Sequence, residues 1–424
     1  MGPVAHGGHC VARLDGQVVF VRHALPGERV VARVTEGGEG SPFLRADAEQ
    51  VLKASPDRVP VRCPVAGPGG CGGCDWQHVS VAGQHRLKAA VVHEQLARLG
   101  HVDVPVAVEA VAGDHSGLGW RTRVQYAADD DGRLGFRRHR SHEVVPVQAC
   151  PIAHAAVQAV PVTASRWPAV RGVEVVAGSA PDDRVIIVHG PEPVALQQAP
   201  AEVGLIVDDV PEAGRPTRRP RRVQGRGFVR QTVRVGEWER TFRVSGSGFW
   251  QVHPGAADAL VGAVLQALDP SPGERVLDLY SGAGLFAAAL ADRVGPSGQV
   301  LAIEADDGAV RDARRNLHDL PQVRLVAGRV DVVLRREPGS PRADLVVLDP
   351  PRTGARKAVV EQVARRRPSA VAYVACDPAA LGRDIALFAG RGYRLAGVRG
   401  FDAFPMTQHV ECVALLVENI STSR

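Results

Sequence analysis

Three absences narrow what this chain can be. Lysine is nearly missing: of the 51 lysine and arginine residues, only Lys53, Lys88 and Lys357 are lysines. The positive charge therefore comes almost entirely from arginine. No apolar run approaches the roughly 20 residues that a membrane-spanning helix needs. The first residues lack the basic stretch and apolar core of a secretion signal. The sequence therefore predicts a cytoplasmic protein with no membrane partner.

The size and charge of the chain indicate several domains and allow a nucleic-acid partner. Its 424 residues exceed what one hydrophobic core usually holds, so two or three domains are expected. The formal net charge is only +5, but six arginines crowd into one short stretch: Arg215, Arg218, Arg219, Arg221, Arg222 and Arg226. Such a cluster suits contact with phosphates, although a solvated loop explains it equally well.

The seven cysteines are unevenly distributed. A disulfide framework is not expected in a cytoplasmic protein. Cys63, Cys71 and Cys74 lie close together, Cys150 precedes a proline, and Cys376 stands alone in a different context. This distribution indicates one metal site, in which three neighbouring thiols need a fourth ligand, and one reactive thiol.

The pattern of elements divides the chain into three parts. Residues 1–54 contain short β-rich runs, at 16–22 and 28–35, which predict a small antiparallel barrel. Residues 55–244 combine the cysteines, an amphipathic helix at 81–99, strand-like pieces, and Pro- and Arg-rich loops. Residues 245–424 alternate strands and helices, which predicts an α/β fold with a mainly parallel, doubly wound sheet. Its ligands are expected at the carboxyl ends of the strands.

A glycine loop follows the first strand of this alternating region. Residues 278–284 read DLYSGAG and stand directly before a helix, where glycines let a ligand approach the backbone. Glu304, at the end of the next strand, can accept both hydroxyls of a ribose. The loop lacks the third glycine of a dinucleotide fingerprint, which disfavours a nicotinamide cofactor and favours S-adenosylmethionine. A plain tight turn is the alternative reading of the glycines alone.

Two further residues suggest covalent chemistry at the same edge. Cys376 stands before a helix capped by Asp377, and a helix N-terminus stabilises a thiolate, an effect that the charge of Asp377 moderates. The alternative is a buried, unreactive cysteine at the end of a strand, with a structural role only. Glu411 falls inside an otherwise apolar strand, where burial would raise its pKa and make it a usable general base.

The sequence resembles the uracil-5 RNA methyltransferases, which make 5-methyluridine in tRNA and 23S rRNA. The resemblance extends over nearly the whole chain and is carried by five ordered motifs, at residues 249–252, 278–284, 349–352, 376–378 and 404–411. It implies a class I (Rossmann-like) methyltransferase domain at 245–424, an N-terminal TRAM domain with an OB-like barrel at 1–54, and a central iron–sulfur and RNA-binding domain at 55–244.

The resemblance also assigns roles to residues of this chain. It implies that Cys376 attacks C6 of uracil and that Glu411 later removes the C5 proton. The implied contacts to S-adenosylmethionine come from Gln251, Tyr280, Glu304 and Asp349, together with Gly282 and Gly284 of the loop. The sequence departs from the family pattern at His253 and at Leu285. It also departs near Arg329, the place where the family pattern leads us to expect an acidic or amide residue that contacts adenine.

The central domain is expected to hold a metal group and to contact RNA. The iron–sulfur members of the family have a Cys-Pro where this chain has Cys150, which makes Cys63, Cys71, Cys74 and Cys150 the implied ligands. Four thiolates suit zinc as well as a [4Fe-4S] cluster, and the resemblance favours the cluster. Its role is expected to be structural, because it lies on a different domain from Cys376. Residues 132–138 contain three arginines and a phenylalanine. The arginines could contact RNA phosphates, and the aromatic ring could stack on an unpaired base.

Two other functions fit part of the pattern. A cytosine-5 RNA or DNA methyltransferase also uses a cysteine, but places it after proline or threonine, whereas Ala375 precedes Cys376 here. A catalytically silent iron–sulfur RNA-binding protein would not need Cys376 and Glu411. A metal-dependent hydrolase is more distant still, since no His-rich ligand set is present. The preferred reading is uridine C5 methylation, with 23S rRNA favoured over tRNA and no obligate protein partner evident.

Overall fold

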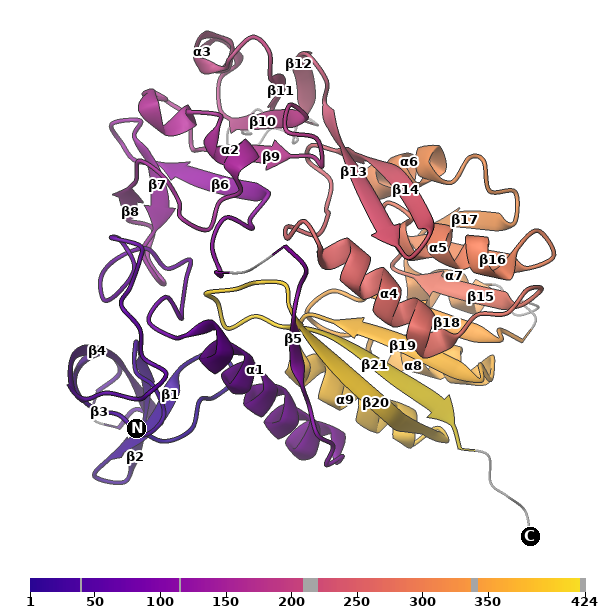
Figure 1. The fold of residues 1–424 in the computed structure, drawn as a ribbon, viewed down its shortest axis with the longest axis horizontal. Helices are drawn as coiled ribbons and strands as arrows, with labels where there is room; N and C mark the ends of the chain where they lie inside the picture. Colours follow the sequence, from indigo (N-terminus) through magenta and orange to yellow (C-terminus); the bar gives the residue numbers. More distant parts are fainter. Residues whose placement is uncertain (39, 114–115, 209–219, 337–341, 420–424) are drawn as a thin grey trace.

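The computed structural model describes residues 1–38, 40–113, 116–208, 220–336 and 342–419, whose strands form four sheets (Figure 1). A four-stranded sheet near the N-terminus adjoins a seven-stranded central sheet, and an eight-stranded sheet carries the C-terminal half. A two-stranded hairpin lies against the helices of that larger sheet. No helix in the described ranges is both long and apolar enough to cross a membrane.

The N-terminal sheet has the strand order β1-β2-β4-β3. Its strands are β1 (Cys10–Leu14), β2 (Gln17–Arg22), β3 (Arg29–Glu36) and β4 (Phe43–Lys53). Alternate residues such as Val19, Val21, Leu44 and Ala46 point into its small core, as the two-residue period of a strand requires. The expected antiparallel arrangement is only partly right, because β2 and β4 run parallel.

The central sheet has the order β12-β11-β10-β9-β6-β7-β8. Its strands are β6 (Arg123–Ala128), β7 (Leu134–Arg137), β8 (Val144–Pro146), β9 (Gly172–Ala177), β10 (Arg184–His189), β11 (Gly204–Val207) and β12 (Arg221–Gln224). Short helices accompany it: α2 (Ala155–Gln158), a 3-10 turn (Val162–Ala164) and α3 (Glu192–Gln198). Its core residues are mainly valine, with Trp167 completely buried.

The helix expected at 81–99 is present as α1 (Val81–Gln95), followed by a π-helical turn (Leu96–Gly100). Ser80 begins it as N-cap, because its side chain accepts a hydrogen bond from Gly83 N. The expectation of an ordinary amphipathic helix is wrong, since its buried face includes the polar residues Gln84, Lys88 and Gln95. These side chains have partners far along the chain, which no local pattern predicts.

The C-terminal sheet has the order β17-β16-β15-β18-β19-β21-β20-β5. Its strands are β5 (Val108–Ala110), β15 (Arg275–Leu279), β16 (Gln299–Glu304), β17 (Val323–Ala327), β18 (Leu345–Leu348), β19 (Ala370–Ala375), β20 (Tyr393–Asp402) and β21 (Glu411–Glu418). Strands β15 to β19 pair in parallel and β21 is antiparallel to β19. The parallel strands therefore end at one edge, where their following loops meet. Strand β5 comes from the central part of the sequence, so that part contributes to two sheets.

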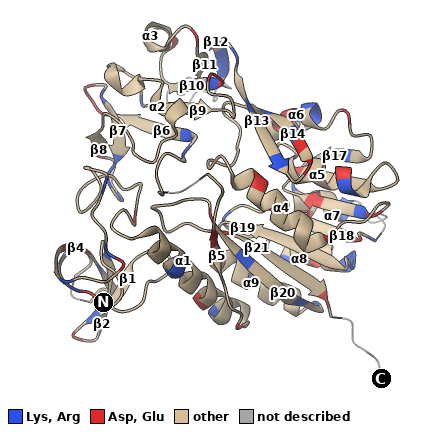
Figure 2. Ribbon diagram, viewed as in Figure 1, with Lys and Arg blue, Asp and Glu red and all other residues tan. Residues whose placement is uncertain are grey.

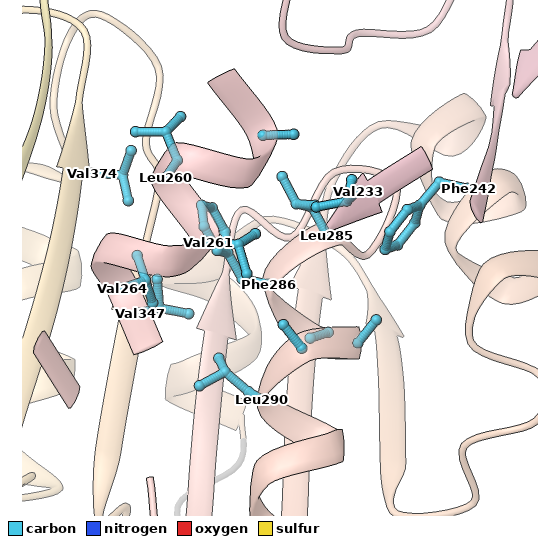
Figure 3. Packing of buried hydrophobic residues seen from close by; sticks show 14 of the residues in the cluster. Val233, Phe242, Leu260, Val261, Val264, Leu285, Phe286, Leu290, Val347 and Val374 are labelled. Atoms are coloured by element: carbon cyan, nitrogen blue, oxygen red, sulfur yellow. The ribbon is translucent and has the colours of Figure 1, made fainter. Parts of the chain in front are cut away.

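Helices cover both faces of this sheet (Figure 1). They are α4 (Ala256–Leu268), α5 (Leu285–Val294), α6 (Asp307–Asn316), α7 (Val330–Arg336), α8 (Arg356–Arg365) and α9 (Pro378–Ala389). The hairpin strands are β13 (Phe228–Val235) and β14 (Trp238–Ser245). Val233 and Phe242 of this hairpin share one buried cluster with Leu260, Leu285 and the sheet (Figure 3). The hairpin is thereby part of the core that supports the ligand edge.

Candidate active site

Cys376 and Glu411 lie side by side at the carboxyl edge of the sheet. Cys376 directly follows β19, and Glu411 opens β21, the antiparallel neighbour of β19. Ala375 pairs with Cys412, so the next register position sets Cys376 opposite Glu411. Directly opposed residues of an antiparallel pair present their side chains on the same face. Two residues 35 positions apart in sequence (411 minus 376) are thus brought into one site.

Buried carboxylates dominate the electrostatics of this site. Glu411 is only 4% exposed, and burial raises its pKa well above the usual value, with a further increase from the charge of Asp349. Burial alone raises the pKa of Asp349, which follows β18, to about 7. Arg352 opposes the effect on Glu411. The pKa expected for a buried Glu411 is confirmed in direction.

The thiol of Cys376 is held in its neutral form. Burial and then the charges of Glu411 and Asp349 raise its pKa to about 12, with Arg352 acting in the opposite direction. The thiolate stabilisation expected from the N-terminus of α9 is therefore wrong for this arrangement of the site. The carboxylates come from other strands, so the residues next to Cys376 do not reveal them. A thiolate at this position is scarce but strongly nucleophilic when it forms.

The turn after Cys376 is built as expected. Asp377 is the N-cap of α9 and accepts a hydrogen bond of 2.7 Å from Ala380 N, and Pro378 occupies the first turn. His6, from the segment before β1, lies 3.3 Å from the second oxygen of Asp377. His409 also borders this edge, and burial followed by the charge of Arg352 lowers its pKa to about 4. His409 belongs to the motif at 404–411, but neither histidine was given a role from the sequence, because their contacts come from distant parts of the fold.

The glycine loop lies between β15 and α5, with its backbone in left-handed conformations. Tyr280 has a φ of 65°, Gly282 of 54° and Gly284 of 93°. A side chain at Gly284 would collide with Leu317, so this turn requires glycine. The hydroxyl of Ser281 is buried and has no hydrogen-bond partner among the described residues. An unsatisfied polar group beside a tight turn fits a polar ligand.

Glu304 stands at the end of β16, next to this loop. One carboxylate oxygen accepts a hydrogen bond from Gly282 N at 2.9 Å, and the other accepts from Ala305 N and Asp306 N. A carboxylate has about four acceptor positions and three are occupied here, so the side chain is fixed and keeps about one position for a ribose hydroxyl. Asp278 is almost completely buried, and burial followed by the charges of Asp349 and Glu304 raises its pKa to about 8.

Gln251 lies outside these loops, in the segment between β14 and α4. Its side chain is 9% exposed, and the carbonyl of Val252, the next residue, accepts hydrogen bonds from the backbone and side chain of Thr122. The central part of the chain thereby anchors this segment. Along this edge, the charges of Asp349 and Glu304 raise the pKa of Asp278, and the charge of Asp349 also raises the pKa of Glu411.

The four cysteines of the central region surround one cavity. Its volume is about 210 Å³, and its walls include Cys63, Cys71, Cys74 and Cys150. Burial raises the pKa of Cys71 and Cys150, and raises that of Cys74 to about 12. Within the described ranges, no group of three or more His, Cys, Asp or Glu is arranged to hold a single metal ion.

Basic and aromatic side chains lie on several exposed surfaces. Phe136 of β7 packs on Tyr126 at 5.1 Å between ring centroids and is followed by the exposed Arg137. In the N-terminal sheet, Arg45 lies over the rings of Phe20 and Phe43. Figure 2 includes basic positions on β7, β12 and the hairpin β13–β14. Arg215, Arg218 and Arg219 of the expected arginine cluster lie outside the described residues, whereas Arg221 is paired with Glu192.

Comparison with known proteins identifies the family. The model of the TRAM domain matches residues 2–48, and the model of the tRNA (uracil-5-)-methyltransferases matches residues 339–419. An uncharacterized RNA methyltransferase of Streptomyces avermitilis is 51% identical, over 98% of this chain and 96% of that protein. Another from Bifidobacterium longum is 38% identical, over 96% and 93%. This chain belongs to the uracil-5 RNA methyltransferases. As a member it is an enzyme that uses S-adenosylmethionine and acts on RNA.

Two further similarities concern the fold of this uracil-5 RNA methyltransferase. Residues 251–334 match the model of protein-L-isoaspartate(D-aspartate) O-methyltransferase, which spans the glycine loop and Glu304. The crystal structure of Pyrococcus abyssi tRNA (uracil-54, C5)-methyltransferase with S-adenosyl-L-homocysteine superimposes with a TM-score of 0.72. It covers 98% of this chain and 99% of its own, at 23% identity. The mixed α/β fold, with an N-terminal TRAM domain and a Rossmann-like methyltransferase domain, is thereby established.

Proposed function

We propose that this enzyme methylates C5 of a uridine in structured RNA through a covalent bond between Cys376 and C6. The observation that carries the proposal is the register of β19 and β21, which sets Cys376 opposite Glu411, with Asp349 close enough to raise the pKa of both. A nucleophile and a buried base on one face of one sheet edge are what addition and elimination across the C5–C6 bond require.

The chemistry follows from the two side chains. The neutral Cys376 thiol first loses its proton to solvent, the thiolate then bonds to C6, and the C5–C6 double-bond electrons make C5 nucleophilic. S-adenosylmethionine, when bound, supplies the electrophilic methyl group that C5 takes. The Glu411 carboxylate then accepts the C5 proton, the C5–C6 double bond forms again, and the C6–S bond breaks to return the thiolate. The raised pKa of Glu411 makes its carboxylate a strong base for this step, and Glu411 afterwards releases the proton to solvent.

The cofactor is expected to occupy the edge between the glycine loop and Cys376. In this proposal Glu304 binds the ribose, and Gly282 and Gly284 let the cofactor lie close to the backbone of the loop. Tyr280, Gln251 and Asp349 make further contacts with the cofactor. The fixed orientation of Glu304 and the unpartnered hydroxyl of Ser281 support this assignment. Among the described residues we nominate none for the adenine contact near Arg329.

We further propose that Cys63, Cys71, Cys74 and Cys150 hold a [4Fe-4S] cluster. The support is one cavity lined by four thiols, which are the usual ligands of such a cluster. The group would belong to a central domain at 55–244, between a TRAM domain at 1–54 and the methyltransferase domain at 245–424. In this assignment the thiols hold the group and take no part in methyl transfer.

We favour 23S rRNA over tRNA as the substrate. We also propose that the enzyme acts in the cytoplasm. The support is the combination of a TRAM domain with the four-cysteine cavity. Mapping 5-methyluridine in rRNA and tRNA from a strain that lacks the protein tests this directly. Loss of one or more 5-methyluridines from 23S rRNA is the expected result. Loss from tRNA alone would contradict the substrate, and retention of every 5-methyluridine would contradict the activity.

A further inference from the structure

The loop that carries the base is bound along its length to a different part of the chain. Residues 403–410 connect β20, which ends at Asp402, to Glu411 at the start of β21. At its apex, Met406 has a φ of 66°, a left-handed conformation that costs a non-glycine residue about 1 kcal/mol or more. Such a conformation persists only where surrounding contacts enforce it. These contacts come from the segment at 75–88.

Both backbone groups of Met406 are held. Its N–H donates to the side-chain oxygen of Gln84 at 2.7 Å, and its carbonyl accepts from the N–H of Trp76 at 3.0 Å. The amide nitrogen of Gln84 donates to Val79 O at 2.9 Å, which fixes the orientation of the amide. The strained apex is thus formed against α1. Farther along the loop, Gln408 N donates to Asp75 at 3.3 Å.

Lys88 holds the other end of the loop. It lies one helical turn after Gln84 on the same face of α1, and its ammonium donates to the carboxylate of Asp402 and to Phe404 O at 3.0 Å. His85 lies 3.2 Å from the second oxygen of Asp402. Lys88 is completely buried and Asp402 is 1% exposed. A buried ion pair adds little net stability but strongly disfavours any arrangement that separates its members.

This anchoring bears directly on the base. Phe401, next to Asp402, pairs with Glu411 in the register of β20 and β21. We propose that Lys88 and Gln84 are positioning residues, which fix Glu411 relative to Cys376 from outside the methyltransferase sheet. Cys376 itself is held by β19 and by the cap of α9. Removing the Lys88 and Gln84 side-chain contacts therefore frees the loop before Glu411, whereas Cys376 keeps the strand and the helix cap that hold it.

This inference rests on the proposed function and predicts a specific defect. Lys88→Met should still add to uridine and accept the methyl group, but should remove the C5 proton slowly. Turnover on ordinary RNA should fall by roughly tenfold to a hundredfold, as expected for a misplaced catalytic group. The covalent complex with ordinary RNA should accumulate and survive a denaturing gel. Trapping on RNA that carries 5-fluorouridine, which needs no base, should proceed at the wild-type rate.

Two further variants complete the test. Gln84→Met should give the same defect without leaving a buried charge unpaired, so it replaces Lys88→Met should that variant fail to fold. Lys357→Met removes an exposed lysine on α8 and should behave as wild type. Folded Lys88 and Gln84 variants that turn over normally, or that lose fluorouridine trapping together with turnover, would overturn the inference. Wild-type protein that forms no adduct on either RNA would instead overturn the covalent chemistry on which the inference depends.

Discussion

His6 Nε2 lies 3.3 Å from Asp377 Oδ2, so the N-terminal segment contacts the residue next to the nucleophile. The other oxygen of Asp377 caps α9 through Ala380 N. A second contact supports the same arrangement, because the Gly8 carbonyl accepts a hydrogen bond from the indole of Trp76, whose backbone N–H donates to Met406 O in the loop before Glu411. The TRAM domain is therefore packed against the catalytic edge and is not a separate appendage.

The cap and the ion pair should make unequal contributions to stability. Asp377→Ala should lower the free energy of unfolding by about 1 kcal/mol, within the range of ~0.5–2 kcal/mol for a lost N-cap. His6→Ala should cost less than about 1 kcal/mol, because the pair is partly exposed to solvent. Urea unfolding measures both changes.

Two controls separate these contributions. Asp306→Ala removes the N-cap of α6, which has a similar hydrogen bond to Ala309 N, and reports the cap alone. His6→Ala should have no effect in protein that already carries Asp377→Ala. The His6–Asp377 interaction would be contradicted if His6→Ala lowered the free energy of unfolding more than Asp377→Ala does. It would also be contradicted if His6→Ala still lowered the free energy of unfolding in the double variant.

The reactivity of Cys376 should increase with pH. Because its thiol pKa is raised to about 12, the thiolate fraction lies far below saturation at neutral pH and should rise about tenfold per pH unit from pH 7 to 9. Alkylation by iodoacetamide, followed at the Cys376 peptide by mass spectrometry, measures this slope. In Glu411→Gln, which removes a charge that raises the pKa, alkylation at pH 8 should be faster. A rate that is already constant above pH 7 would rule out the raised pKa.

Much of the C-terminal half could be predicted from sequence because its signals are local. The sequence predicts strands at 275–279 and 370–375 and a helix at 378–389, and β15, β19 and α9 have these bounds, since apolar strands alternate with capped helices there. Strand β5 was missed, because three residues carry no periodicity and their partner strand β20 lies almost 300 positions away. Helix α7 was also missed, next to a stretch outside the described residues.

The sequence predicted that Cys376 and Glu411 lie at one edge of the sheet and that burial raises the pKa of Glu411, but it did not predict the raised pKa of Cys376. Cys376 and Glu411 stand at strand ends, and the order of strands brings them together. The pKa of Cys376 depends on carboxylates from two other strands, so the helix N-terminus was a misleading guide. Lys88 and Asp402 are 314 residues apart, and a lysine within a helix reads from sequence as a solvated side chain.

Glu304 should be required for cofactor binding. Glu304→Ala removes a charged hydrogen-bond acceptor beside the glycine loop, a loss of roughly 1.5–3 kcal/mol, or about tenfold to a hundredfold in the Kd for S-adenosylmethionine. Isothermal titration calorimetry measures this change. Glu274→Ala is a matched control, because Glu274 precedes β15 at the opposite edge of the sheet. Equal affinities for the two variants would remove the ribose assignment.

The four-cysteine cavity should contain iron. Anaerobically purified protein should be brown, with about four iron and four sulfide per chain. Cys74→Ser should lose the iron, whereas Cys10→Ser, outside the cavity and hydrogen-bonded to Ala24 O, should retain it. Stoichiometric zinc without sulfide would show that the thiols hold a different group.

The covalent step is the central claim, and trapping on 5-fluorouridine tests it most directly. Fluorine cannot leave C5 as a cation, so after methyl transfer Glu411 has no proton to remove and the C6–S bond cannot break. RNA with 5-fluorouridine at the target should therefore become linked to the wild-type enzyme in a complex that survives denaturing electrophoresis. Glu411→Gln should form this complex and should also stall on ordinary RNA, whereas Cys376→Ala should form none and transfer no methyl group. Substantial methylation by Cys376→Ala would contradict the mechanism.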